Sequence, residues 1–95
     1  IILLDAFNSL GLPTSTTVGN TRLTMTALRI TGANSCELSC RINVSIYEAD
    51  PDDVDTIKGN LPNAAAAIKK QLGGRVSVRV VLYDSKGRLI TSATK

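Results

Sequence analysis

The chain has 95 residues with a net charge of +3, and 43% of them are hydrophobic while only 3% are aromatic. This length suits a single domain over residues 1–95 with an interior of Val, Ile, Leu and Ala, and no apolar run approaches the roughly 20 residues needed to span a bilayer. Histidine is absent, which excludes Ser-His-Asp and Cys-His catalysis and, with only two cysteines, a structural zinc site.

The first twelve residues carry an apolar stripe with helical spacing. Leu3, Phe7 and Leu10 recur at intervals of four and three, and Ile2 lies beside them. We therefore predict an apolar N-terminal helical arm over residues 1–12. This arm either docks on the domain's own sheet or contacts another subunit, and in the second case these four residues form the oligomer contact.

A loop and a hairpin are predicted next. Residues 13–20 are rich in Thr and Ser, which indicates a loop ahead of an α+β core at 21–95. Residues 21–31 have the composition of a Thr-rich strand, and the parity of its apolar residues switches at 27–28, which predicts a β-bulge. The turn signal at 32–35 then leads into the next strand.

The strongest strand signal lies at residues 38–46, where apolar and polar residues alternate. Residues 76–83 repeat this pattern and are the predicted partner strand. Cys36 and Cys40 share the inward parity of the first strand, and four strand residues span about 13 Å, too far for a disulfide. We expect two free, buried thiols, which are more typical of the cytoplasm than of an oxidising compartment, although the sequence does not define the localisation.

Signals for a broken helix follow at residues 50–72. Asp50 can cap the helix and Pro51 suits its first position. Apolar residues then recur at spacings of three and four, as on one face of a helix. Pro62 interrupts this face, which predicts a kink or a second helix that starts near Leu61.

The chain ends in a predicted hairpin. Asp84 and Gly87 occupy the first and fourth positions of a type I turn, and residues 88–93 return as a short edge strand. The resulting order is α-β-β-α(kinked)-β-β. It predicts an α+β fold, a two-layer sandwich in which an antiparallel or mixed sheet carries the helices on one face.

The C-terminal half is basic, which is compatible with nucleic acid or another acidic partner and equally with a solvated face of a soluble domain. The candidate nucleic-acid contacts are Lys69, Lys70, Arg75 and Arg79, at the end of the helical region and along the adjoining strand. The alternative is a self-associating structural subunit (an oligomer, coat or filament) that uses the apolar arm and the edge strand. In both cases we expect a non-enzymatic binding module without a cofactor, a metal or a small-molecule substrate.

Three segments carry a family resemblance. Residues 23–26 open a hairpin and residues 41–47 close it. An acidic stretch follows and leads to the segment 61–73, which contains four consecutive alanines. Over residues 23–73 this pattern resembles the ribosome-binding factor A family of type II KH-like domains, although the Gly-x-x-Gly of ordinary KH domains is absent. The resemblance implies an interrupted helix pair and binding to small-subunit ribosomal RNA.

Overall fold

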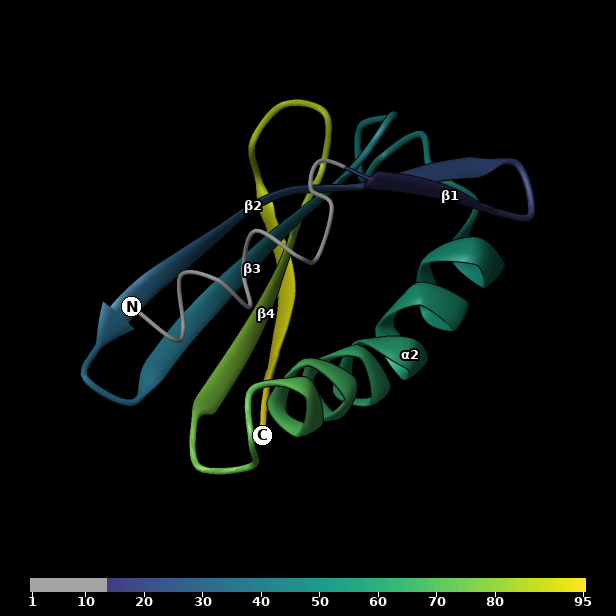
Figure 1. The fold of residues 1–95 in the computed structure, drawn as a ribbon. Coiled ribbons are helices and arrows are strands. Elements are labelled where there is room, and N and C mark those ends of the chain that lie inside the picture. The colour runs from purple at the N-terminus through teal and green to yellow at the C-terminus, as the bar shows by residue number, and fades with distance from the viewer. Residues whose placement is uncertain (1–13) are drawn as a thin grey trace.

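The computed structural model describes residues 14–95, which form one mixed sheet and one helix (Figure 1). The elements are β1 (Thr14–Val18), β2 (Thr21–Gly32), β3 (Ser35–Ile42), α2 (Pro51–Gln71), β4 (Ser77–Tyr83) and β5 (Leu89–Thr94). The strands lie side by side in chain order, with β3 and β4 parallel and all other neighbours antiparallel. The predicted α+β architecture, with helix packed on one face of a mixed sheet, is confirmed.

β3 and β4 form the centre of the sheet because their alternate residues are buried on one face. In β3 this buried set runs from Cys36 through Leu38 and Cys40 to Ile42. The parallel register sets Leu38 opposite Val80, which is also buried. The predicted pairing of these two segments is confirmed, and α2 supplies the crossover that a parallel pair requires.

The predicted β-bulge in β2 is confirmed. The register with β3 shifts between Met25 and Ala27. As a result, Met25 lies opposite Cys40 and Leu28 lies opposite Leu38. Because directly opposed residues share a face of the sheet, the shift keeps the apolar side chains of both halves of β2 on the helix side.

α2 begins where predicted but continues as one helix. The Asp50 side chain accepts a hydrogen bond from the Asp52 N–H at 2.9 Å, as an N-cap does. Pro62 lies inside the helix, so the predicted alternative of a second helix starting near Leu61 is wrong. Tertiary packing outweighs the lost backbone bond because one apolar face continues on both sides of the proline. The buried residues of that face are Val54, Ile57, Leu61, Ala65 and Ile68.

The predicted loop at 13–20 is wrong, because Thr14–Val18 forms strand β1. β1 pairs with the first part of β2, where Thr16 lies opposite Leu23 and Val18 lies opposite Thr21. The predicted N-terminal helix at 1–12 lies outside the described residues. No helix among residues 14–95 is long and apolar enough to cross a membrane.

The central strand ends at Ile42, so the predicted extension through residues 43–46 is wrong. The Asn43 N–H still donates to the Arg22 carbonyl of β2 at 3.1 Å, but the residues that follow bond to the β4–β5 turn. The Ser85 N–H donates to the Val44 carbonyl at 3.1 Å, and the Ile46 N–H donates to the Asp84 carboxylate at 3.0 Å. The predicted turn itself is confirmed, since the Gly87 N–H donates to the Asp84 carbonyl at 3.1 Å.

Candidate functional site: an apolar pocket between β1 and α2

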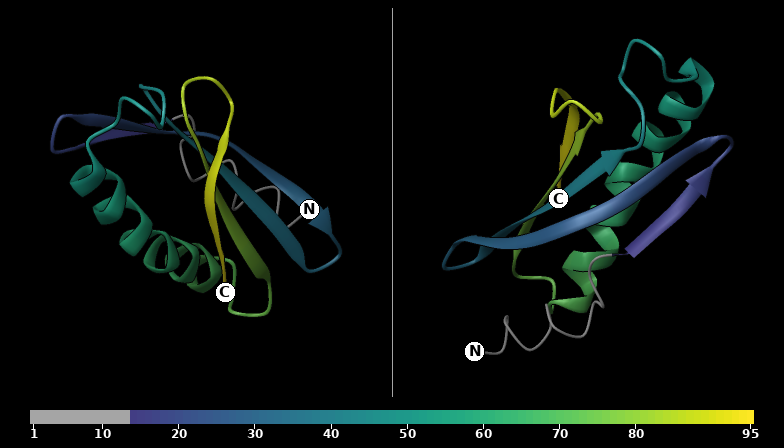
Figure 2. Two further views of the ribbon diagram at one scale, coloured as in Figure 1. Left: turned by 180° about the vertical axis from the view of Figure 1, so that it is seen from behind. Right: turned by 90° about the horizontal axis from the view of Figure 1, so that it is seen from above.

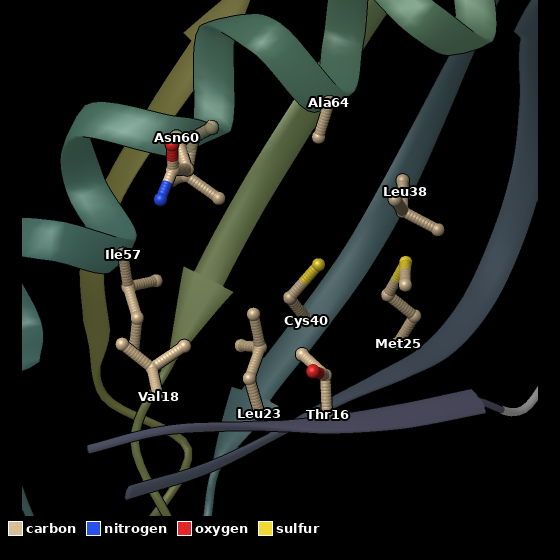
Figure 3. A pocket seen from close by; sticks show the side chains of 10 residues that line it. Thr16, Val18, Leu23, Met25, Leu38, Cys40, Ile57, Asn60 and Ala64 are labelled. Carbon is tan, nitrogen blue, oxygen red and sulfur yellow. The ribbon is translucent and has the colours of Figure 1, made fainter.

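An apolar cavity of about 290 Å³ lies between α2 and the first three strands (Figure 3). The strands supply Leu23 and Met25 from β2 and Leu38 and Cys40 from β3. The sulfur atoms of Met25 and Cys40 lie on the same side of the cavity in Figure 3. Thioether and thiol side chains are apolar and adapt to irregular partners, so this wall suits a hydrophobic guest.

The opposite wall of the pocket comes from one face of α2. Ile57, Leu61 and Ala64 follow one another at spacings of four and three, and all three line the cavity. Ala64 presents only a methyl group, so the helix leaves space where a larger side chain would fill it. The exposed Asn60 adds a polar group to the lining.

The third wall is β1, which contributes Thr16 and Val18. The β1–β2 turn is bonded to the first turn of α2, because the Asp53 carboxylate accepts from the Asn20 N–H at 3.1 Å and from the Thr21 hydroxyl at 3.0 Å. Gly19 has a φ of 60°, and a Cβ at this position would collide with the Asp53 carboxylate. The turn therefore needs glycine, and the contact to Asp53 sets the distance between β1 and α2.

The predicted loop at residues 13–20 is incompatible with this pocket, because strand β1 forms one of its walls. A usable signal was present: the segment Thr14–Val18 is β-branched at four of its five residues. β-branched residues favour strands, and the Gly19-Asn20 pair that follows is a two-residue turn between β1 and β2.

Both cysteines are free and buried, as predicted. Burial raises the pKa of the Cys40 thiol to about 11 and raises that of Cys36 as well. Because only a thiolate is a nucleophile, neither side chain is activated for chemistry. The Cys40 thiol acts as part of the apolar wall.

We expect a water-soluble disulfide reagent at pH 8 to modify the folded chain at least about tenfold more slowly than the urea-unfolded chain. The reason is that both thiols are shielded and Cys40 stays protonated at this pH. The release of the coloured thiol product measures the two rates. Prompt modification of one thiol in the folded chain would contradict the burial of that residue.

A second polar cluster surrounds Asp84, whose residue is 0% exposed. One carboxylate oxygen accepts from the N–H groups of Lys86 at 2.9 Å and Arg88 at 2.8 Å, and the other accepts from the Ile46 N–H at 3.0 Å. Burial raises the pKa of Asp84, but these three N–H donors and the Arg88 charge outweigh it and hold the pKa below its ordinary value. The carboxylate therefore stays ionised.

Arg88 completes this cluster. Its Nη1 lies 3.6 Å from the Asp84 carboxylate and donates to the Ser45 hydroxyl at 3.3 Å, and its guanidinium lies 4.9 Å from the centre of the Tyr47 ring. The cluster joins the β3–α2 loop to the β4–β5 turn. Because it joins these two segments, we assign this cluster a structural role. Among residues 14–95 no group of Cys, Asp and Glu side chains could hold a metal ion.

The predicted nucleic-acid contacts are not brought together. Lys69 and Lys70 lie on the last turn of α2, and Arg75 lies in the loop that follows. Arg79 lies on the face of β4 opposite to its buried neighbours Val78 and Val80, and so on the far side of the sheet from α2. The four cations are divided between the two layers and do not form one surface.

Comparison with known proteins identifies the fold. No protein family model matches the sequence, and no curated protein matches it. Two solved structures match. EpsS, the pilotin of the type 2 secretion system of Vibrio vulnificus, has 21% identity to this chain and a TM-score of 0.64, and the match covers 98% of this chain and 86% of EpsS. AspS, a type II secretion system pilotin from Vibrio cholerae, has 20% identity and a TM-score of 0.61, and the match covers 99% of this chain and 87% of AspS. Identity at this level establishes a shared fold.

These structures correct the functional predictions. The two matching structures are pilotins, so the resemblance to ribosome-binding factor A and KH-like domains is wrong. The RNA-binding role is wrong for the same reason, and the division of its four predicted contacts between two layers agrees with this. The alternative of a self-associating structural subunit is also wrong, because both matching structures are secretion-system pilotins. Its contact residues Ile2, Leu3, Phe7 and Leu10 lie outside the described residues.

Proposed function

We propose that this chain is a non-enzymatic, pilotin-like protein that binds a polypeptide component of a type II secretion system in the pocket between β1 and α2. The fold shared with two secretion pilotins supports the class of protein. The apolar cavity is the observation that carries the proposal, because it is a preformed concave site in the described part of the chain.

The size and chemistry of the pocket favour a side chain of a polypeptide over a metabolite. Its volume of about 290 Å³ lies just below the range of small-molecule sites, which usually exceed about 300 Å³. A buried aliphatic or aromatic anchor of a partner fits a pocket of this kind. The polar groups in the lining are the Thr16 hydroxyl and the Asn60 amide, which do not titrate near neutral pH, and the Cys40 thiol is protonated. None of these groups can act as a general acid or base there.

The test uses the full chain and overlapping fluorescent peptides that cover the subunits of a Vibrio type II secretion system. Fluorescence anisotropy then measures which peptides bind. We expect a small set of neighbouring peptides with a shared apolar anchor to bind, and replacement of that anchor by Ser to abolish binding. The absence of any specific peptide would contradict the proposal.

Ala64→Phe should weaken binding of such a peptide by at least about tenfold, because the ring occupies the space that the anchor needs. Ala66→Phe is the matched control, since Ala66 is exposed and lies about 200° around the helix axis from Ala64. Far-ultraviolet circular dichroism establishes that both variants are folded. Equal affinities for the two variants would locate the binding surface outside this pocket.

A further inference from the structure

α2 covers one face of the sheet and leaves the other face uncovered by helix (Figure 2). The face away from α2 carries arginines from three neighbouring strands. Arg29 of β2 and Arg79 of β4 both lie opposite Glu37 of β3, in one row across the sheet. Arg41 lies four residues along β3 from Glu37, on the same face. The neighbours of these residues in β3, such as Leu38 and Cys40, point to the core, so the arginines point away from it.

This arginine face, defined as Arg29, Arg41 and Arg79, has an excess of positive charge. All three residues are exposed. Arg29 is 3.4 Å from the Glu37 carboxylate, whereas within residues 14–95 neither Arg41 nor Arg79 has an ion-pair partner. Arg22 lies on the same face of β2 and is also exposed. The face therefore holds guanidinium groups that are available to an anionic partner.

Apolar side chains lie next to these charges. Arg41 lies opposite Tyr83, which in turn lies opposite Leu89. Tyr83 is half-buried, and Leu89 is 59% exposed. A guanidinium binds phosphate oxygens in a bidentate manner, while a phenol ring and an aliphatic chain are stable at the boundary between headgroups and acyl chains.

Glu37 is the acidic residue on this face, and four other acidic residues lie together away from it. Asp50, Asp52, Asp53 and Asp55 lie at the start of α2, in the other layer of the fold. An anionic surface therefore attracts the arginine face and repels the start of the helix. Electrostatics alone would orient the molecule on such a surface.

We propose that the arginine face docks on an anionic phospholipid bilayer. A lipid surface offers a continuous array of phosphates and imposes no register, so it suits cations distributed over an open sheet. The pocket between β1 and α2 lies on the opposite side of the sheet and stays accessible in this orientation. Membrane docking is therefore independent of the proposed binding of a polypeptide, and either one can fail without the other.

The test is co-sedimentation of the full chain with vesicles of phosphatidylcholine, alone or mixed with phosphatidylglycerol, over a range of salt concentrations. We expect binding to the anionic vesicles at low salt, little binding to pure phosphatidylcholine, and loss of binding as salt rises. Absence of binding to anionic vesicles at low salt overturns the proposal.

Two triple variants with the same change in charge locate the surface. Arg29→Gln/Arg41→Gln/Arg79→Gln should bind anionic vesicles about a hundredfold more weakly, since each cation near the membrane contributes about fivefold. Lys58→Gln/Lys70→Gln/Arg75→Gln removes three exposed cations away from this face and should retain most of the binding. Equal losses in the two variants overturn the proposal, because they would report net charge alone.

Three further measurements distinguish docking of this face from unfolding and from binding of any polyanion. Arg29→Lys/Arg41→Lys/Arg79→Lys keeps the charge but not the bidentate contact, and should recover part of the vesicle binding lost in the glutamine variant. Circular dichroism checks that every variant is folded. If the wild-type chain binds soluble polyglutamate through the same arginines as tightly as it binds anionic vesicles, the assignment to a lipid surface is overturned.

Discussion

Asp84→Asn is expected to lower the melting temperature of the chain by about 10 °C at neutral pH. An asparagine keeps one acceptor oxygen, which can still serve the Lys86 and Arg88 N–H groups as the Asp84 oxygen does at 2.9 and 2.8 Å. In the wild-type chain the Ile46 N–H and the Arg88 guanidinium contact the second carboxylate oxygen of Asp84. In the variant the amide nitrogen takes the place of this oxygen and faces the same two donors. The amide nitrogen is itself a donor and cannot accept from either group, so the β3–α2 loop loses the bond from the Ile46 N–H and keeps the one from the Ser85 N–H to the Val44 carbonyl.

The same interaction predicts how stability depends on pH. The pKa of Asp84 in the folded chain is below its ordinary value of 3.8, because backbone donors and Arg88 stabilise the ionised form despite burial. A carboxyl group with a depressed pKa contributes stability above its unfolded pKa and loses that contribution as pH falls through its folded pKa. The difference in melting temperature between the wild-type chain and Asp84→Asn should therefore be largest above about pH 5 and shrink below pH 4.

Asp55→Asn is the control for the Asp84 experiment, since Asp55 is exposed on α2. This variant removes the same charge and should shift the melting temperature by less than about 2 °C at all pH values. Thermal denaturation followed by circular dichroism from pH 3 to pH 8 measures the three chains. A difference for Asp84→Asn that stays constant across this range would show that the Asp84 charge does not stabilise the folded state.

Much of the sheet could be predicted because the decisive signals are local. The alternation in β3 and β4 follows from burial of one face, and the parity switch in β2 identified the bulge that lies between Met25 and Ala27. The Asp84–Gly87 turn and the Asp50 cap also depend on neighbours a few residues away. In each case the physical cause acts over a single turn or strand, which a sequence pattern can report.

The pocket could not be predicted in the same way, because it depends on contacts between distant segments. Thr16, Leu23, Cys40 and Ile57 come from four elements, and only the folded chain brings them to one cavity. The interaction of Asp53 with the β1–β2 turn spans more than thirty residues, as its sequence separations of 33 and 32 show. An aspartate in the first turn of a helix is already favoured by the helix dipole, so its position in the sequence does not reveal this second contact.

The four predicted nucleic-acid contacts do not form one surface, for a related reason. Lys69, Lys70 and Arg79 are close in sequence, but a helix and a strand on different layers separate them. The arginines that do share a surface, Arg29, Arg41 and Arg79, are spread over fifty residues of the sequence and meet only through strand register. Proximity along the chain is therefore a poor guide to charge on a sheet face.

Leu82→Ala should reduce the free energy of unfolding by about 3 kcal/mol. Leu82 is 0% exposed and lies opposite Cys40 in β3 and Thr91 in β5, within the same buried cluster as Ile57 and Leu61 of α2. Removal of its side chain leaves a cavity where the helix packs on the two parallel strands, and the loss is a large fraction of the roughly 5–15 kcal/mol that stabilises a domain.

Leu89→Ala is the matched control for Leu82→Ala, because it makes the same chemical change in the same hairpin at a residue that is 59% exposed. We expect it to cost less than about 0.5 kcal/mol. Urea unfolding followed by circular dichroism measures both variants, and the denaturant slope should stay unchanged because the surface exposed on unfolding is nearly the same. If the two leucine variants lose similar stability, the Leu82 side chain is not part of the core between α2 and the sheet.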